Sequence, residues 1–151
     1  MVARSMFALN GTIMRVLFRL RVEGLENVPE GGPFIIAPNH VSYLDSFVVA
    51  AALPRGVLRC TYWAGWTGAD FGNPLTRLVG RLAQVVPVDP CRAGPSGLAF
   101  GATGLGRGQN LVWFAEGERS RTGSLQPFKP GVGILLGYYP VPVVPVFIRG
   151  T

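Results

Sequence analysis

The sequence predicts an α/β fold in which helices flank a mixed central sheet. Short apolar runs at residues 34–37, 85–88 and 141–146 are rich in valine and isoleucine and have the length of buried strands. Longer stretches between them have helical features: residues 46–53 are rich in alanine, and residues 74–82 begin with a proline. Strands that alternate with helices along one chain are typical of α/β folds.

The predicted elements follow one another without a linker or repeat, so we expect one domain over residues 21–151. Strands are predicted at 21–25, 34–37, 57–63, 85–88, 110–114 and 141–146, and helices at 46–53, 74–82, 96–106 and 131–139. The prolines of the last strand indicate an edge or bulged position in the sheet. The four glycines within the helix at 96–106 indicate either close packing or a frayed element.

The N-terminal stretch, residues 1–20, is predicted to form an amphipathic helix. Apolar residues recur along it with roughly helical spacing, and Arg15 and Arg19 lie four residues apart on one side. A helix of this kind contacts a membrane surface when its arginines bind head-group phosphates and its apolar side enters the lipid. The alternative is a helix that packs on the body of the domain.

The composition favours a partner that is both anionic and apolar. Apolar residues make up 48% of the chain and charged residues 15%, which leaves more apolar surface than a typical domain exposes. The net charge of +6 attracts phospholipid head groups or phosphate-bearing substrates. The arginines form no basic run, so we expect no nucleic-acid partner. One histidine and two distant cysteines do not make a zinc site, so we expect no metal and two unpaired thiols, Cys60 and Cys91.

The single histidine, His40, lies just beyond the predicted strand at 34–37. Imidazole takes up and releases a proton near neutral pH more readily than other side chains do. Asp45 follows five residues later, where a turn into a helix would bring its carboxylate back to the ring. A carboxylate bonded to one ring nitrogen leaves the other nitrogen available as a base. The pair therefore predicts general base catalysis, and the alternative is an ordinary hydrogen-bonded histidine in a loop.

A second polar cluster, residues 114–123, follows the strand predicted at 110–114. The two segments together resemble the glycerolipid acyltransferase family. That family has an Asn-His-x-x-x-x-Asp block, matched by Asn39, His40 and Asp45, and a Phe-Pro-Glu-Gly-Thr-Arg-Ser block, matched by Phe114, Glu116, Gly117, Arg119 and Ser120. Ala115 and Glu118 replace the proline and the threonine of the second block. Two blocks in the right order make the resemblance specific.

The resemblance implies roles for these residues. His40 and Asp45 are the expected catalytic pair, with His40 as the base and Asp45 orienting its ring. The residues expected to bind substrate are Arg92, Glu116, Gly117, Arg119, Ser120 and Lys129. Among them, the two arginines and Lys129 supply positive charge for the phosphate of the acceptor, and Glu116 anchors the loop. The alternative for each of these cations is a solvated side chain.

The reaction implied by the resemblance belongs to phospholipid biosynthesis. A fatty acyl group passes from an acyl thioester, either acyl-CoA or acyl carrier protein, to the hydroxyl of a lysophospholipid such as 1-acylglycerol-3-phosphate. We expect no cofactor besides this acyl donor, and a peripheral location on the cytoplasmic face of a membrane. The alternatives are a non-catalytic lipid-binding module and an acyl thioesterase. Residues 141–146 match a further block of the family, Val-Pro-x-x-Pro-Val. Family members commonly continue beyond this block, so we expect a chain truncated at its C-terminus.

Overall fold

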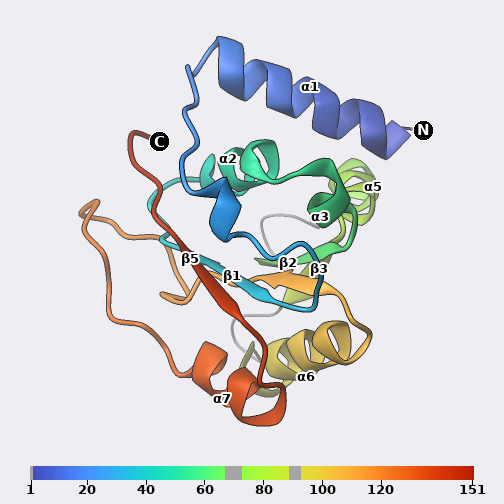
Figure 1. Cartoon of the computed structure of the whole chain (residues 1–151), viewed down its shortest axis with the longest axis vertical. Helices are drawn as coiled ribbons and strands as arrows, with labels where there is room; N and C mark the ends of the chain where they lie inside the picture. The colour runs from blue at the N-terminus through green and yellow to red at the C-terminus, as the bar shows by residue number, and fades with distance from the viewer. Residues whose placement is uncertain (1, 67–72, 89–92) are drawn as a thin grey trace.

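A computed structural model describes residues 2–66, 73–88 and 93–151 of the chain. Figure 1 shows a central sheet with helices on both of its faces. The sheet has five strands in the order β3-β2-β4-β1-β5, and every described pairing is parallel. The predicted α/β class is therefore confirmed, while the sheet is parallel where a mixed one was expected. The reason is that a helix connects each strand to the next and returns the chain to the same edge.

The elements lie close to their predicted positions. The strands are β1 (Ile35–Pro38), β2 (Thr61–Trp66), β3 (Val85–Val88), β4 (Asn110–Val112) and β5 (Val143–Val146). The helices are α1 (Val2–Val16), the short 3-10 helix η1 (Leu25–Asn27), α2 (Asp45–Ala52), α3 (Arg55–Arg59), α5 (Pro74–Leu82), α6 (Ala93–Gly106) and α7 (Gly131–Tyr138). Strand β5 is at the edge of the sheet, as its prolines indicated.

Two predicted strand segments were wrong. Residues 21–25 form no strand, because Gly24 turns the backbone with φ 76° and the chain enters η1. The strand predicted at 57–63 begins late, because Pro54 first starts the helix α3, and the amide of Leu58 donates to its carbonyl at 2.9 Å. Proline is well suited to the start of a helix. Apolar residues in so short a run do not distinguish a helix from a strand.

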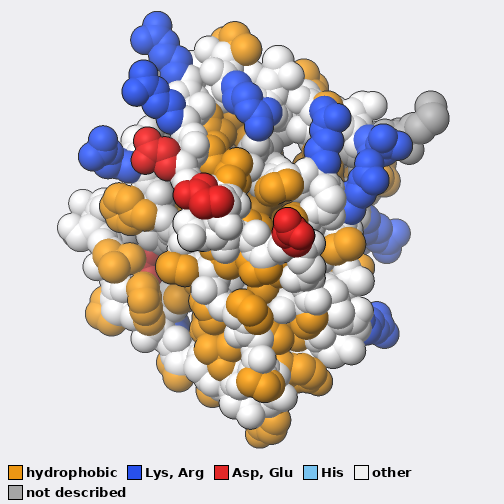
Figure 2. Space-filling model, viewed as in Figure 1, with side chains coloured by type: hydrophobic (Ala, Val, Ile, Leu, Met, Phe, Trp, Pro, Cys, Tyr) orange, Lys and Arg blue, Asp and Glu red, His pale blue; other side chains and the backbone are white. Residues whose placement is uncertain are grey.

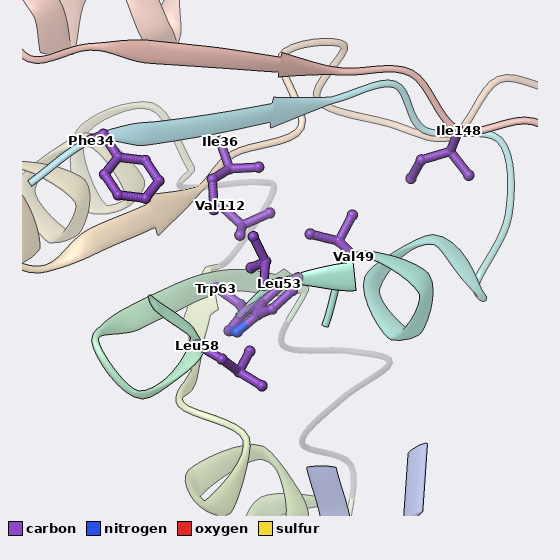
Figure 3. Close-up of a cluster of buried hydrophobic side chains, with 8 residues drawn as sticks. All are labelled: Phe34, Ile36, Val49, Leu53, Leu58, Trp63, Val112 and Ile148. Carbon is purple, nitrogen blue, oxygen red and sulfur yellow. The ribbon is translucent and has the colours of Figure 1, made fainter. Parts of the chain in front are cut away.

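The core lies on both faces of the sheet, because neighbouring residues of β1 point in opposite directions. Ile35 packs in a buried cluster with Leu135 of α7 and residues of α6. Ile36 packs in a second cluster on the other face, together with Val49 of α2 (Figure 3). Both isoleucines are fully buried. This packing fixes the position of β1, whose C-terminal end leads to His40.

Helix α1 packs on α2 and also exposes apolar side chains. Asn10 Nδ2 donates to the carbonyl of Phe47 at 2.9 Å, and an Arg15 guanidinium nitrogen donates to the carbonyl of Ala51 at 3.0 Å. Met14 of the same helix is buried. Exposed apolar residues in and directly after α1 are Leu9, Val16, Leu17 and Phe18. The helix therefore packs on the body of the domain, and its contact with a membrane surface stays a prediction.

None of the helices within the described residues has the length and hydropathy needed to cross a membrane.

Candidate active site

The pairing of β1 with β4 places His40 beside Glu116. Ile36 pairs with Val112 in this parallel register, and His40 and Glu116 each lie four residues further along their own strand direction. Both strands therefore deliver a polar residue to the same edge of the sheet. The backbone amide of His40 donates to Glu116 Oε1 at 2.7 Å. The two sequence blocks are thus brought into direct contact.

Glu116 is buried, with 1% of its surface exposed, and its carboxylate holds the site together. Its second oxygen, Oε2, accepts a hydrogen bond from the amide of Gln126 at 2.8 Å. Each oxygen therefore receives a backbone amide, one from the turn that contains His40 and one from the loop that follows Glu116. A buried carboxylate needs such donors because burial removes its hydration. This geometry fits the anchoring role expected for Glu116 rather than direct contact with substrate.

His40 is held through both its backbone and its ring. Its carbonyl accepts a hydrogen bond from the amide of Ser120 at 2.7 Å. Its ring stacks on Phe114, with centroids 4.0 Å apart and an angle of 25° between the planes. These contacts come from the segment that also contains Glu116, so the second sequence block determines the orientation of the histidine.

Asp45 lies at the start of α2 and binds the histidine ring. Its Oδ2 is 2.9 Å from His40 Nδ1 and also accepts the amides of Val41 at 2.7 Å and Ser42 at 2.8 Å. The Asp45 side chain is fully buried, and the positive end of the helix dipole favours its charge. A carboxylate accepts hydrogen bonds, so Nδ1 is the donor in this contact, and in the neutral form of the ring Nε2 then has the free lone pair. Among the described residues Nε2 has no hydrogen-bond partner, and the histidine side chain is 19% exposed.

The segment after β5 completes the surroundings of Asp45. The hydroxyl of Thr151 donates to Asp45 Oδ1 at 2.8 Å. Asn39, in the first sequence block, holds this segment: its Oδ1 accepts the amide of Ile148 at 2.6 Å, and its Nδ2 donates to the carbonyl of Ile148 at 3.0 Å. The sequence analysis missed Thr151. The available signal was its position shortly after an apolar strand, which becomes informative only once β5 is known to pair with β1.

The positively charged residues of the candidate site have different partners. The guanidinium carbon of Arg119 lies 3.5 Å from the ring centroid of Tyr43, within the turn between His40 and Asp45. This contact holds Arg119 next to His40 and Asp45, and the sequence analysis did not identify Tyr43 as its partner. Lys129 Nζ instead lies 3.4 Å from Glu118 Oε1, and both side chains are more than half exposed.

Three other predicted site residues have structural explanations or cannot be placed. Gly117 has φ 73°, and a β-carbon there would lie 2.7 Å from Lys129 Cδ, so the position favours glycine. Ser120 is buried, and its amide binds the carbonyl of His40. Arg92 lies outside the described residues. Within the described ranges no group of three histidine, cysteine, aspartate or glutamate residues is placed to bind a metal, and Cys60 is a free thiol.

The fold and this geometry define a parallel α/β domain with a His-Asp pair, its carboxylate buried, at the C-terminal edge of the sheet. The chain belongs to the Acyltransferase family, which it matches over residues 19–149. The match covers both sequence blocks and all five strands.

The chain is similar to several relatives. It is 32% identical over 142 residues to 1-acyl-sn-glycerol-3-phosphate acyltransferase alpha of Homo sapiens, covering 88% of this chain and 47% of that protein. It is 31% identical over 142 residues to the chloroplastic 1-acyl-sn-glycerol-3-phosphate acyltransferase BAT2 of Brassica napus, covering 89% of this chain and 38% of that protein. The chain spans about half the length, or less, of the curated relatives it matches.

The fold is also similar to a solved structure. The crystal structure of the 1-acyl-sn-glycerophosphate (LPA) acyltransferase PlsC from Thermotoga maritima superimposes with a TM-score of 0.76 at 24% sequence identity. The match covers 98% of this chain and 59% of that chain. This likeness confirms the arrangement of the parallel sheet and its helices.

Proposed function

We propose that this chain transfers a fatty acyl group from an acyl thioester to the hydroxyl of a lysophospholipid such as 1-acylglycerol-3-phosphate, in phospholipid biosynthesis. The observation that carries the proposal is the 2.9 Å contact between His40 Nδ1 and the buried carboxylate of Asp45. The names of the relatives support the choice of acceptor, since they describe acyltransferases for 1-acylglycerol-3-phosphate.

The proposed mechanism uses Nε2 of His40 as a general base. Nε2 removes the proton of the acceptor hydroxyl while the hydroxyl oxygen attacks the carbonyl carbon of the thioester. A carbon–oxygen bond forms, and the carbon–sulfur bond then breaks to release a thiolate. The thiolate takes the proton back from Nε2, so the products are an ester and a thiol. Asp45 holds the ring and stabilises the imidazolium between these steps.

Arg119 is the proposed ligand for the acceptor phosphate. Its contact with Tyr43 keeps the guanidinium next to the turn that carries the catalytic pair. Stacking engages the face of the guanidinium and leaves N–H donors at its edge for phosphate oxygens. Lys129 contributes less direct attraction in this proposal, because Glu118 lies 3.4 Å from its ammonium group. Arg92 remains a proposed second ligand.

The acyl donor in this proposal is acyl-CoA or acyl carrier protein, and no further cofactor takes part. Helix α1 supports a peripheral location on a membrane, because it exposes Leu9 and Val16 while Met14 packs against the domain. Apolar side chains at such a surface gain free energy by leaving water for lipid. The proposed site of action is the cytoplasmic face, where acyl thioesters would be available.

The test is an acyl-transfer assay with the purified chain. Labelled acyl-CoA or acyl carrier protein is supplied with a panel of lysophospholipids, and the product lipids are separated. His40→Ala is expected to lower the rate about 100- to 10,000-fold, the usual contribution of a general base. Arg107→Ala is the control, because Arg107 is an exposed residue at the end of α6. Near-normal transfer by His40→Ala would rule out the mechanism.

The same assay distinguishes the alternatives. Release of free fatty acid without any acceptor would identify a thioesterase that uses water at the His40–Asp45 pair. Binding of lysophospholipid without product formation by the wild-type chain, with either donor, would identify a non-catalytic lipid-binding module.

A further inference from the structure

A second cluster of positive charge lies where the end of α1 approaches the segment after β5. A cavity of about 230 Å³ lies there, and none of its lining residues belongs to the Glu116 loop. Leu44 and Thr151 line it as well, so it adjoins the buried carboxylate of Asp45, whose Oδ1 binds Thr151. Three arginines line it, Arg19, Arg21 and Arg149, and its apolar side includes Met14, Phe18 and Val48. Figure 2 shows basic side chains gathered in the upper part of this face, where Figure 1 places α1 and the C-terminal segment.

The three arginines that line the cavity are exposed and have no ion-pair partner among the described residues. None of the described residues that line the cavity is acidic. Within the described part of the chain, no ion pair or side-chain hydrogen bond involves Arg19, Arg21 or Arg149. Like charges that converge on one cavity repel each other, and an anion would remove that cost. The planar guanidinium, with its several N–H donors, is especially suited to phosphate oxygens.

The backbone of Arg19 gives a second, independent indication. Arg19 has φ 51°, in the left-handed region that favours glycine. It ends the helical turn after α1, where the amide of Leu20 donates to the carbonyl of Met14 at 3.1 Å. Glycine is the usual residue at this kind of helix end. An arginine at a position that favours glycine indicates a role for the residue, and Arg19 is one of the residues that line the cavity.

We propose that this cavity binds the phosphate of an anionic glycerophospholipid. The three guanidinium groups hold the phosphate, and the lipid chains pass along the apolar side toward Leu17 and Phe18, which are 72% and 54% exposed. The apolar side and these exposed residues favour a lipid over free phosphate, because they gain nothing from an inorganic ion. Arg119 does not line this cavity, although Thr151 does, and lipid binding there does not depend on acyl transfer.

The test is a binding titration of the full 151-residue chain with soluble dihexanoyl phosphatidylglycerol. This lipid is neither 1-acylglycerol-3-phosphate nor the diacylglycerol phosphate formed from it, and the titration contains no acyl donor, so binding is measured independently of acyl transfer. Dihexanoyl phosphatidylcholine and inorganic phosphate are titrated in parallel. We expect phosphatidylglycerol to bind most tightly. Arg21→Ala and Arg149→Ala should each lower its affinity about fivefold.

Two arginine variants outside the cavity serve as matched controls. Arg107→Ala removes one exposed positive charge directly after α6, and Arg119→Ala removes the proposed acceptor ligand, so both variants should bind phosphatidylglycerol as the wild type does. Arg19→Gly should also bind more weakly, yet its melting temperature should be equal or higher, because glycine accepts φ 51° without strain.

Three results would overturn the proposal. Unchanged affinity in both Arg21→Ala and Arg149→Ala would remove the cavity as the site. Loss of binding in Arg119→Ala alone would place the phosphate at the candidate active site instead. Equal affinity for inorganic phosphate and phosphatidylglycerol would show that a free anion, and not a lipid, is the occupant.

Discussion

The hydroxyl of Thr151 donates a 2.8 Å hydrogen bond to Oδ1 of Asp45, which lies 106 residues earlier in the chain. The other oxygen of the same carboxylate binds the ring of His40. Asp45 is fully buried, and Thr151 is the partner of Oδ1 among the described residues. The threonine therefore acts on the proposed base through the carboxylate and is a positioning residue.

Thr151→Val tests this role, because valine keeps the shape and removes the donor. Oδ1 of Asp45 would then be buried without its hydrogen bond, which leaves the carboxylate less firmly oriented. We expect kcat of acyl transfer to fall about tenfold, equivalent to about 1.4 kcal/mol, with little change in KM. Thr151→Ser keeps the donor and should retain most of the activity. Equal kcat values for the two variants would contradict the role.

Asn39→Ala removes the clamp that holds the segment carrying Thr151. Asn39 is buried and makes hydrogen bonds to both the amide and the carbonyl of Ile148. Loss of these two hydrogen bonds leaves the amide and the carbonyl of Ile148 unpaired in a buried position, so the free energy of unfolding should fall by about 2–4 kcal/mol. The matched control is Asn10→Ala, which removes one exposed hydrogen bond, to Phe47, and should cost under about 1 kcal/mol. Urea denaturation measures both, and equal losses would contradict the clamp.

The short-range parts of the site could be predicted from the sequence, and the long-range parts could not. His40 and Asp45 are five residues apart, so a single turn determines their pairing. The contact between His40 and Glu116 was not predicted, and it follows from the register of β1 with β4. The contact with Thr151 depends on β5 lying beside β1, and local sequence patterns do not specify strand order.

The predicted elements show the same limit. Residues 74–82 and 85–88 were located correctly, because a proline and a run of valines define them. Residues 57–60 were assigned to a strand, because four residues do not reveal a helical period. Pro54, which ends one helix and starts the next, was the signal for that short helix.

Glu116→Gln tests the anchoring role of the buried carboxylate. Glutamine keeps one acceptor oxygen for one of the two backbone N–H groups. Its side-chain NH2 group is a donor and would face the other backbone N–H, which is also a donor. We expect the free energy of unfolding to fall by about 2–3 kcal/mol, and acyl transfer to fall as the His40 turn loses its support. Glu118→Gln is the matched control, since it removes one exposed ion pair with Lys129 and should change stability by under about 1 kcal/mol. Similar losses in both would contradict the role.

The glycines of α6 provide a prediction in which two similar substitutions have opposite signs. A β-carbon on Gly101 would lie 3.0 Å from Leu135 Cδ1 and 3.2 Å from Leu111 Cδ2, both buried, so Gly101→Ala should lower the free energy of unfolding by about 1–2 kcal/mol. A β-carbon on Gly104 meets no atom within 4 Å, so Gly104→Ala should raise it by about 0.5–1 kcal/mol through the better helix propensity of alanine. Urea denaturation compares the two. Stabilisation by both would show that α6 does not pack closely against α7, and that its glycines instead reflect a frayed helix.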